Sequence, residues 1–402
     1  MKILQLCHKS PYPPQEGGSM AMYAVTRMLL QQGCEVKVLA VNSPKCHIRK
    51  EDVPATLLGR TRMEWVYIDT SLHAGAALHA LLRNRSYHAV RFHSPDMEAR
   101  IAALLQAEEF DIIHIESIFP AVYLPVIRRY SRAKVVIRAH NMEHRIWERV
   151  ASHTANPLKR AYLRLLSKQL KTYELDALRQ ADGIAAISRI DAENFRRMGV
   201  STPMEVIPFG ICPPETAETP ATTPLNLFSI ASMNWQPNTE GLQWFAKRCW
   251  PLIHARFPQL ECLLAGRHFP QDFLHPLPQG LRVVGEVEDA GAFMRENGIL
   301  IVPLLSGSGV RIKILEGMSY AKPIITTSIG AEGIDVTDKQ NILLADTPEA
   351  FLDAVSHCMV HPEQCRRMGE AARAFVCQAH DERRIAERLS AFYQSLLSTK
   401  NQ

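Results

Sequence analysis

The feature that most constrains the fold is an alternation of short apolar runs with amphipathic helical patterns along all 402 residues. Such alternation is typical of parallel sheets whose strands are connected by helices. The first series of predicted strands covers residues 2–7, 35–41, 63–68, 89–93, 111–115, 134–139 and 183–187. The second series covers residues 225–231, 260–265, 281–284, 299–303, 323–327 and 342–345. A chain of this length with two such series is expected to form two α/β domains, each with its own core.

Between the two series lies CPPETAETPATTP, a stretch rich in Pro and Thr and poor in large apolar residues. This composition is typical of a linker. We therefore expect an N-terminal domain at 1–210, a linker at 211–224, a C-terminal domain at 225–378 and a last helix at 379–402. Doubly wound sheets bind ligands beyond the carboxyl ends of their strands, so the expected site is a cleft between the two domains.

Composition excludes several classes of protein. The nine cysteines include no C-x-x-C pair, which favours reduced core residues over a disulfide framework or a zinc site. The first residues, MKILQLCHKSPYPP, resemble a strand followed by prolines and lack the apolar stretch of a signal peptide. No run approaches the roughly 18 apolar residues of a membrane span. We expect a cytoplasmic protein.

Basic residues are concentrated in one region. Residues 128–171 contain twelve Lys or Arg and two acids, although the whole chain has a net charge of only +5. Within this region, a helical pattern places five apolar residues roughly on one face, namely Leu158, Tyr162, Leu165, Leu166 and Leu170. Such a helix can rest on the anionic inner face of a membrane, attract an acidic acceptor, or simply cover a core. Nucleic-acid binding is not indicated, because no aromatic-interleaved basic motif accompanies the charge.

The strongest candidate binding segment is 306–334, SGSGVRIKILEGMSYAKPIITTSIGAEGI. Gly307 and Gly309 allow the backbone to approach a ligand closely and to adopt positive φ. The helix predicted after them has free N–H groups and a partial positive charge at its first turn, which favours a phosphate.

Three charged residues follow these glycines. Arg311 and Lys313 add full positive charges near the start of the helix. Glu316 lies about 10 Å further along the helix than Gly309, where its carboxylate can accept hydrogen bonds from a ribose diol. Few ligands other than a nucleotide sugar need a phosphate site and a diol site at this separation. The alternative is a surface helix with an ion pair between Lys313 and Glu316.

The segment VVIRAHNMEHRIW has two interpretations. His140, Glu143 and His144 spell H-x-x-E-H, an inverted zinc-protease motif that needs both histidines on one helix. Because His140 directly follows a predicted strand, we favour a histidine at a strand end that faces the substrate. A purely structural histidine is also open at this stage.

Other strand ends carry Gly, Asn or charge. After the first strand, Gly17-Gly18 open a helix, either as a site for a phosphate or sugar oxygen or as turn chemistry alone. Asn238 is expected to cap a helix. In the second half the ends of strands carry Asn234, Arg267, Gly285 and Val287.

These motifs resemble a known family. GSGVRIKILEGMSYAKPIITTSIGAEGI resembles the donor-binding signature of GT-B glycosyltransferases of the family 4 kind, and VIPFGI, LLAGRH and VVGEVED occur in the order that family uses. IRAHNMEHRIW and DGIAAIS resemble its N-terminal half, so the likeness covers nearly the whole chain. It implies an α/β fold of the GT-B type, with two Rossmann-like doubly wound domains facing a cleft and a C-terminal helix that crosses back. It also implies retaining transfer from a nucleotide sugar without a catalytic metal or other cofactor.

The resemblance implies roles for the donor-side residues. Glu316 would bind the ribose hydroxyls, and Arg311 and Lys313 would face the diphosphate. The backbone of Gly309 and Val310 would face the diphosphate as well. The sequence departs from the family in two respects. Ser308 stands where a partner glutamate is often found, and Asn234-Trp235 and Asn238 stand where many members carry Arg and Lys.

The resemblance also implies roles in the first half and at the base. His140 would contact the donor sugar and assist the transition state. Gly17-Gly18 would lie against the phosphate or the acceptor, and the turn from Gly285 to Val287 would lie against the base. Independently of the resemblance, Arg267 at its strand end is a candidate diphosphate contact.

We therefore expect a cytoplasmic glycosyltransferase that uses a UDP- or GDP-sugar and a glycan or lipid-linked acceptor, as in surface polysaccharide or lipopolysaccharide synthesis. Acceptor choice is expected to depend on loops 10–18 and 46–62. A nucleotide-sugar epimerase and a non-catalytic sugar-nucleotide-binding module are the alternatives. A nicotinamide-dependent oxidoreductase is not favoured, since no G-x-G-x-x-G follows the first strand.

Overall fold

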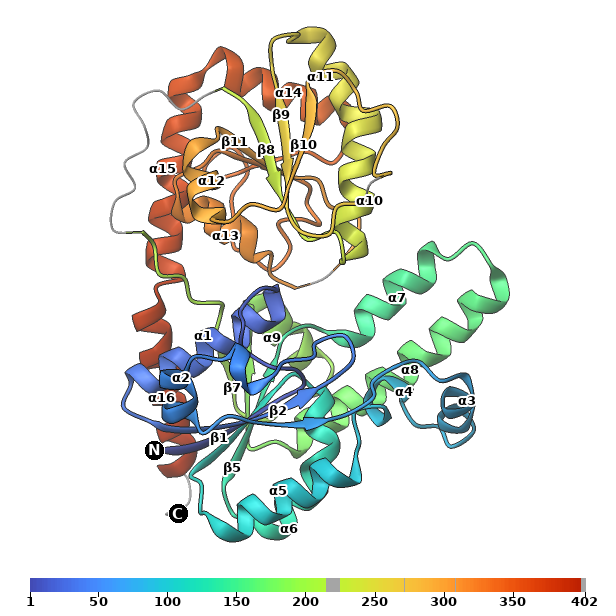
Figure 1. Cartoon of the computed structure of the whole chain (residues 1–402), viewed down its shortest axis with the longest axis vertical. Coiled ribbons are helices and arrows are strands. Elements are labelled where there is room, and N and C mark those ends of the chain that lie inside the picture. Colours follow the sequence, from blue (N-terminus) through green and yellow to red (C-terminus); the bar gives the residue numbers. More distant parts are fainter. Residues whose placement is uncertain (215–224, 271, 308, 399–402) are drawn as a thin grey trace. The chain divides into compact units, whose positions relative to one another are not determined.

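The computed structural model describes residues 1–214, 225–270, 272–307 and 309–398 (Figure 1). These residues pack as two units. Unit 1 comprises Met1–Phe209 with the chain from Glu382 onward, and unit 2 lies within Gly210–Asp381. Most of the predicted linker, residues 215–224, lies outside the described residues.

Unit 1 is built on a seven-stranded parallel sheet in the order β3-β2-β1-β4-β5-β6-β7. Its strands are β1 (Lys2–Cys7), β2 (Glu35–Asn42), β3 (Glu64–Tyr67), β4 (Ile112–Glu116), β5 (Lys134–Ala139), β6 (Gly183–Ala186) and β7 (Met204–Val206). The sheet grows in one direction from β1 to β3 and then resumes on the other side of β1 with β4. The reversal point, where such sheets bind ligands, is therefore between β1 and β4.

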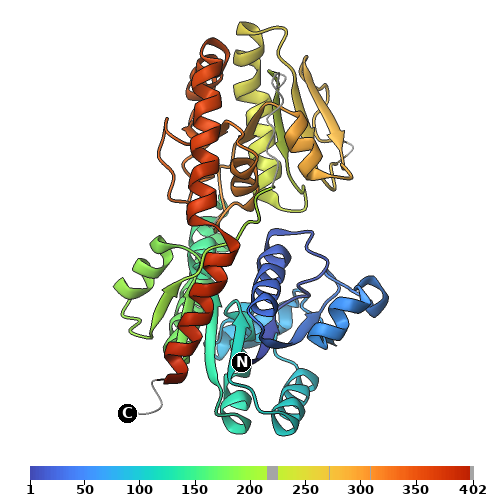
Figure 2. The ribbon, with the colours of Figure 1, turned by 90° about the vertical axis from the view of Figure 1, so that its left-hand side faces the viewer.

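Helices cover both faces of this sheet. They are α1 (Gly17–Gln31), α2 (Ala55–Thr61), α3 (Ala74–Leu82), α4 (Tyr87–Val90), α5 (Pro95–Ala107), α6 (Leu124–Tyr130), α7 (Glu143–His153), α8 (Pro157–Gln180), α9 (Arg189–Arg197) and α16 (Glu382–Ser398), with 3₁₀ turns at Lys50–Asp52 and Phe119–Tyr123. The last helix of the chain, α16, packs on unit 1 (Figure 2), as predicted for a C-terminal helix that crosses back. Its buried Ile385, Leu389 and Tyr393 join a core with Ile3 and Val36.

One predicted strand, 89–93, is wrong. The segment instead forms the short helix α4, with Val90 N donating to Ser86 O at 3.0 Å and Arg91 N to Tyr87 O at 3.1 Å. The apolar character that suggested a strand reflects burial of the helix, because His88 stacks on Trp147 of α7 with ring centroids 4.1 Å apart.

Unit 2 repeats the architecture with a six-stranded parallel sheet in the order β10-β9-β8-β11-β12-β13. The strands are β8 (Leu227–Ile230), β9 (Cys262–Ala265), β10 (Leu281–Gly285), β11 (Ile299–Val302), β12 (Ile324–Thr326) and β13 (Leu343–Leu344). The helices are α10 (Gln236–Trp244), α11 (Trp250–Arg256), α12 (Ala290–Glu296), α13 (Ile312–Ser319), α14 (Pro348–Val360) and α15 (Pro362–Ala379), with a π turn at Phe245–Cys249. Its reversal point is between β8 and β11.

Candidate active site

The reversal point of unit 2 brings together two segments that are about 75 residues apart in sequence. Residues 231–235 lead from β8 to α10, and residues 303–311 lead from β11 to α13. Because β8 and β11 are hydrogen-bonded neighbours, both segments leave the same edge of the sheet. Ser308, the position of the expected partner glutamate, lies outside the described residues.

The glycines of the second segment are required by its conformation. Gly307 has φ +112°, and a Cβ added there would lie 2.9 Å from the ring of Trp235. Gly309 has φ +85°, and its carbonyl oxygen accepts a hydrogen bond at 2.6 Å from Nη1 of Arg311. The Arg311 guanidinium lies 5.1 Å from the centroid of a Trp235 ring. The loop therefore folds over a cation that an aromatic ring holds in place.

A hydrogen bond joins α10 and α13, the two helices that follow these segments. Lys313 Nζ donates at 2.9 Å to Oδ1 of Asn238, and Asn238 Nδ2 donates at 2.8 Å to the carbonyl of Ser232. The predicted capping role of Asn238 is wrong, since Trp235 occupies the N-cap position and Asn238 lies in the first turn of α10. The buried amide orients Lys313 instead.

Burial shifts the pKa values of Lys313 and Glu316, the two ionisable groups on α13, toward their neutral forms. Burial, with the neighbouring charge of Arg311, lowers the pKa of Lys313 to about 7. Burial raises the pKa of Glu316 to about 7, although Lys313 opposes this shift. Both groups lie on α13, three residues apart and therefore on one face. A phosphate favours the charged form of Lys313, so the site is suited to an anion.

The remaining predicted residues of unit 2 lie on neighbouring strand ends. Backbone hydrogen bonds place these ends side by side, with Met233 N donating to Arg267 O at 2.9 Å and Gly266 N to Gly285 O at 2.7 Å. The Arg267 side chain is partly exposed and lies 3.4 Å from a carboxylate oxygen of Glu286. Two further predicted residues, Asn234 and Val287, are exposed and partly exposed. Their contacts with a donor stay a prediction.

Behind the loop, two features of the same motif are structural. Lys322 is buried, and its Nζ donates to the carbonyls of Arg295 at 2.9 Å and Asn297 at 2.7 Å. Gly333 has φ +86°, and a Cβ there would lie 3.2 Å from Val310. The second half of the signature thus supports the loop, whereas its first half carries the charged residues Arg311, Lys313 and Glu316.

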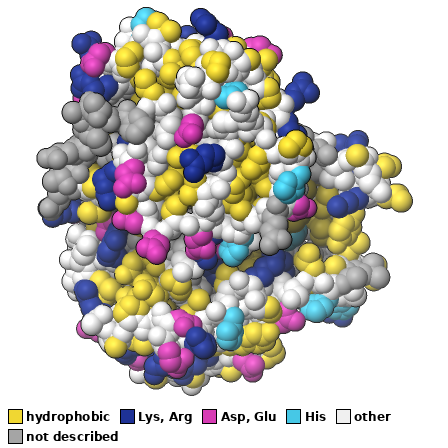
Figure 3. Space-filling view, turned by 45° about the horizontal axis from the view of Figure 1, so that its top comes forward, with side chains coloured by type: hydrophobic (Ala, Val, Ile, Leu, Met, Phe, Trp, Pro, Cys, Tyr) yellow, Lys and Arg dark blue, Asp and Glu magenta, His cyan; other side chains and the backbone are white. Residues whose placement is uncertain are grey.

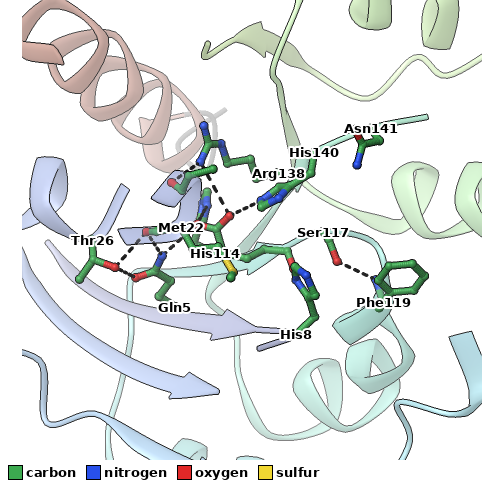
Figure 4. A network of polar contacts seen from close by, with 12 residues as sticks. Gln5, His8, Met22, Thr26, His114, Ser117, Phe119, Arg138, His140 and Asn141 are labelled. Carbon is green, nitrogen blue, oxygen red and sulfur yellow. Dashed lines mark hydrogen bonds and ion pairs between the residues drawn. The ribbon is translucent and has the colours of Figure 1, made fainter. Parts of the chain in front are cut away.

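Unit 1 gathers a second group of polar side chains where β1, β4 and β5 end (Figure 4). His8 directly follows β1, Glu116 is the last residue of β4, and His140 directly follows β5. His140 Nε2 lies 2.6 Å from Oε2 of Glu116. The rings of His8 and His140 meet edge to face with centroids 5.8 Å apart. His140, which was predicted at a strand end, is thus held by a carboxylate at the reversal point of its sheet.

Glu116 is fully buried among donors. Gln5 Nε2 donates to its Oε1 at 2.9 Å, and His114 Nε2 and Arg138 Nη1 lie 3.2 and 3.9 Å from its carboxylate oxygens. Burial by itself raises the pKa of Glu116, but His114, His140 and Arg138 together hold it well below its usual value. Burial lowers the pKa of His140, against the effect of Glu116. An ionised carboxylate therefore lies beside an imidazole that favours its neutral form.

The H-x-x-E-H pattern does not form a metal site. His140 precedes α7 and contacts Glu116, whereas His144 lies on α7 and contacts Glu174 of α8. Burial, with the charge of Glu174, raises the pKa of Glu143 to about 7. Throughout the part of the chain that the structure describes, no group of three or more His, Cys, Asp or Glu residues is placed to hold a metal ion.

Gly17-Gly18 begin α1, and no side chain caps this helix. A Cβ on Gly18 would lie 2.9 Å from Cε of Lys9, and the Lys9 ammonium pairs with Glu16 at 2.9 Å. The glycine therefore makes room for a lysine at the start of α1. Its contact with a phosphate or an acceptor stays a prediction.

Sequence reasoning missed the partners of these residues. Gln5, His114, Glu116 and Arg138 are polar residues inside apolar runs, and such runs in a central parallel strand are buried on both faces. A buried polar group needs a partner, so their presence in neighbouring strands is a signal for a polar network. The packing of Trp235 on Arg311 had no signal in the sequence.

The two doubly wound units define a two-domain α/β protein of the GT-B architecture. A family described as Glycosyltransferase Family 4 matches residues 16–213, and one described as Glycosyl transferases group 1 matches residues 224–361. The chain therefore belongs to the group 1 glycosyltransferases of the family 4 kind.

Relatives among curated proteins match only part of the chain. An uncharacterized 44.6 kDa protein of the cps region of Klebsiella pneumoniae is 20% identical over 170 residues, which are 40% of this chain and 44% of that protein. An uncharacterized glycosyltransferase of Methanocaldococcus jannaschii is 31% identical over 90 residues, which are 22% of this chain and 25% of that protein. The matched segments thus span less than half of either relative.

Solved structures resemble the whole chain. Sucrose-phosphate synthase from Thermosynechococcus elongatus has a TM-score of 0.70 at 15% identity, with 99% of this chain and 100% of that chain covered. Anabaena HepE in complex with UDP has a TM-score of 0.66 at 14% identity, with 98% and 100% covered. A glycosyltransferase from Rickettsia africae has a TM-score of 0.64 at 16% identity, with 100% and 99% covered. At these identities the likeness shows the fold.

Proposed function

We propose that this protein is a retaining glycosyltransferase that moves a sugar from a UDP- or GDP-sugar to a glycan or lipid-linked acceptor. The observation that carries the proposal is the cluster of Arg311, Lys313 and Glu316 at the reversal point of unit 2. Two cations lie at the start of α13 and a carboxylate lies one turn further along. This order matches a diphosphate followed by a ribose diol. Membership of the family and the UDP in the Anabaena structure support the same ligand class.

The chemistry follows from where charge develops. Cleavage of the anomeric bond leaves negative charge on the diphosphate, and fixed cations stabilise it. Arg311 and Lys313 supply that charge, so we propose that the reaction needs no metal cofactor. Glu316 is assigned to the ribose, which leaves the acceptor hydroxyl itself to attack on the face that the diphosphate leaves. The new bond to the anomeric carbon replaces the bond to the diphosphate, and the hydroxyl proton passes to the departing diphosphate oxygen. Retention of the anomeric configuration is the expected result.

The acceptor is proposed to bind unit 1. Its loops form an open hollow of about 630 Å³ lined by Tyr12, residues 50–55 and Leu58. These positions fall within loops 10–18 and 46–62, which the sequence predicted to select the acceptor. The mixture of an aromatic ring, charged groups and apolar groups suits a sugar ring with its hydroxyls. The cps region of the Klebsiella relative supports a surface polysaccharide as the acceptor class.

We propose that the α7–α8 hairpin, which extends from unit 1, contacts the surface of a membrane (Figure 1). Of the predicted apolar face, Leu166 and Leu170 are buried, whereas Leu158, Tyr162 and Leu165 are 82, 38 and 42% exposed. Residues 145–172 contain seven Lys or Arg and one acid. Hydrophobic and basic side chains lie next to one another on this part of the surface (Figure 3). Exposed apolar groups beside cations suit the surface of an anionic bilayer.

No helix within the described ranges is long and apolar enough to cross a bilayer, so this contact is proposed as peripheral. Sedimentation with phosphatidylglycerol vesicles tests it, with phosphatidylcholine vesicles for comparison. Leu158→Ser combined with Leu165→Ser should abolish binding, whereas Leu252→Ser, at an exposed leucine of unit 2, should not. If the double variant bound phosphatidylglycerol vesicles as well as the wild-type protein does, the proposal would be contradicted.

Donor binding is tested by a thermal-shift screen with UDP, GDP, ADP and their sugars, followed by calorimetry. A ligand at 100 times its Kd raises the free energy of unfolding by about 2.7 kcal/mol. Lys313→Ala and Glu316→Ala should each weaken binding about 10- to 100-fold, because each removes a charge-assisted contact worth about 1.5–3 kcal/mol. Lys247→Ala, at an exposed lysine of the same unit, is the matched control. Unchanged binding in both site variants would contradict the assignment.

Product analysis separates the alternatives. A transferase joins the sugar to an acceptor with the anomeric configuration of the donor, which NMR coupling constants report. An epimerase changes the sugar without an acceptor, and a binding module leaves the donor intact. Addition of EDTA should leave the rate unchanged.

A further inference from the structure

A chain of polar contacts connects the C-terminal helix to His140. The Tyr393 hydroxyl of α16 lies 2.6 Å from Nδ1 of His114. His114 Nε2 lies 3.2 Å from Oε1 of Glu116, and Glu116 Oε2 lies 2.6 Å from Nε2 of His140. Figure 4 shows the side chains of His114, Arg138 and His140 close to one another. All of these groups belong to unit 1 although Tyr393 follows unit 2 in sequence.

The proton positions along this series of contacts follow from two groups, the protonated hydroxyl of Tyr393 and the ionised carboxylate of Glu116. Burial raises the pKa of Tyr393 well above its usual value, so its hydroxyl keeps its proton and donates to Nδ1 of His114. The proton of a neutral His114 then lies on Nε2, which is 3.2 Å from Oε1 of Glu116 without forming a hydrogen bond to it. An ionised carboxylate only accepts, so the His140 nitrogen that faces Glu116 must carry a proton. Gln5 Nε2 and His140 Nε2 therefore both donate to the Glu116 carboxylate.

We propose that Glu116 is a positioning residue that holds His140 in the tautomer with its proton on Nε2, and that Tyr393 supports it through His114. The other ring nitrogen of His140, Nδ1, then presents a lone pair to a hydroxyl of the substrate sugar. This inference rests on the proposed sugar transfer. It assigns a role to a carboxylate and to a helix that the donor-side motif does not touch.

The burial of Glu116 argues for function beyond packing. A carboxylate with no exposed surface is costly to desolvate, and a buried ion pair can often be replaced by apolar residues without loss of stability. Here the carboxylate is at the reversal point of the sheet, and the imidazole it holds retains 10% exposure. Its negative charge also lies behind the imidazole, where it stabilises the positive charge that develops on the sugar.

The first test measures the tautomer directly and does not depend on activity. Long-range ¹H–¹⁵N NMR correlations distinguish protonated Nε2 from protonated Nδ1, and the spectrum of His140→Asn identifies the signal among the sixteen histidines. The wild-type protein should show protonated Nε2. In Glu116→Gln, the amide can donate to Nε2, so the proton should move to Nδ1. The same tautomer in both proteins would overturn the inference.

The second test uses kinetics. Glu116→Gln should lower kcat about 10- to 100-fold, as loss of the partner that orients a metal-bound histidine does. The KM for the nucleotide sugar should stay within about twofold, because the proposed donor contacts of the nucleotide lie in unit 2. Glu116→Asp, which keeps the charge, should recover part of the rate. A KM that rises in Glu116→Gln while kcat stays unchanged would contradict a positioning role.

A matched control addresses stability. Glu174 is also a fully buried carboxylate of unit 1 that contacts a histidine, His144, but it has no contact with His140 among the described residues. Glu174→Gln should lower the Tm without changing the His140 tautomer. If Glu116→Gln does not fold, Tyr393→Phe keeps the test open, because it removes one hydroxyl and keeps the ring. It should lower kcat about 2- to 10-fold, the value of one hydrogen bond.

The outcomes separate this inference from the proposed function. If no donor is turned over by the wild-type protein, the proposed function fails, and the NMR comparison still decides the role of Glu116. If sugar transfer occurs and Glu116→Gln keeps its kcat, the inference fails and the proposed function stands.

Discussion

From the pKa values of Lys313 and Glu316 we predict that nucleotide-sugar binding is strongest near pH 7. The pKa of each group is about 7, lowered by burial for the lysine and raised by burial for the carboxylate. A diphosphate needs the ammonium form of Lys313, which is present below pH 7 and is lost above it. A ribose diol needs the carboxylate form of Glu316, which is present above pH 7 and is lost below it. Affinity should therefore fall on both sides of neutrality.

The size of the effect follows from these two pKa values. At pH 7 about half of each group is in its binding form, so about a quarter of the molecules have both. At pH 9 about one molecule in a hundred keeps the Lys313 ammonium, and at pH 5 about one in a hundred keeps the Glu316 carboxylate. Affinity scales with the binding-competent fraction, so it should be about 25-fold weaker at either extreme, or about 1.9 kcal/mol.

Calorimetry between pH 5 and 9 measures this dependence. UDP-glucose is a suitable probe because its doubly esterified diphosphate has no proton that titrates in this range. Lys313→Met should remove the loss of affinity at high pH, and Glu316→Gln should remove the loss at low pH. Constant affinity from pH 7 to 9 in the wild-type protein would refute the reasoning. A loss at high pH that persists in Lys313→Met would refute it as well.

Three further predictions concern the support of this site. Gly241→Ala should lower the free energy of unfolding by about 1–3 kcal/mol in denaturant titrations, because its Cβ would lie 2.1 Å from the carbonyl oxygen of Pro303. Trp235→Ala should weaken nucleotide-sugar binding about 3- to 10-fold by calorimetry, since Arg311 loses a cation–π contact worth about 0.5–1 kcal/mol and its fixed orientation. Lys322→Met should destabilise the protein by about 1–3 kcal/mol in thermal melts, because it leaves two buried carbonyls without a donor, but it should not change the Kd of the donor.

Two of these predictions have a control in the same chain, and the third has an outcome that would contradict it. Gly59→Ala lies on α2, where a Cβ meets no atom within 4 Å, so it should not destabilise the protein. Trp244→Ala removes an indole from the same helix without touching Arg311, so it should cost stability and leave donor affinity unchanged. A donor Kd that changes in Lys322→Met would show that the buried lysine acts on the site.

Much of the fold was predictable from the sequence because strand and helix periods are local. The central strands β1 and β5 have the predicted bounds. The error at 89–93 has a tertiary cause, since Tyr87 and Ala89 of α4 are buried and His88 stacks on Trp147 of α7, so helices rather than a neighbouring strand cover this segment. Similarly, the apolar face predicted in the basic helix is divided in the structure, with Leu166 buried and Leu158 exposed. A pattern reports apolar character but does not say which neighbour covers it.

The candidate site was predictable where one segment contains all its parts. Arg311, Lys313 and Glu316 are close in sequence, and helix geometry alone sets their order. The contacts of Lys313 with Asn238 and of Arg311 with Trp235 join segments about 75 residues apart, so they depended on the pairing of β8 with β11. His140 was predicted as a strand-end residue, but its partner Glu116 was not.

The sequence by itself determined the fold class and the family, because each is expressed in local periodicity or in contiguous motifs, and it predicted a donor site in segment 306–334. The tertiary structure alone decided that Asn238 orients a lysine rather than caps a helix, and that Glu116 joins His140 to the C-terminal helix. Parallel sheets bring together the carboxyl ends of strands that are far apart in the sequence. The pKa and the tautomer of a group buried at such an edge depend on its spatial neighbours, which a local sequence pattern does not identify.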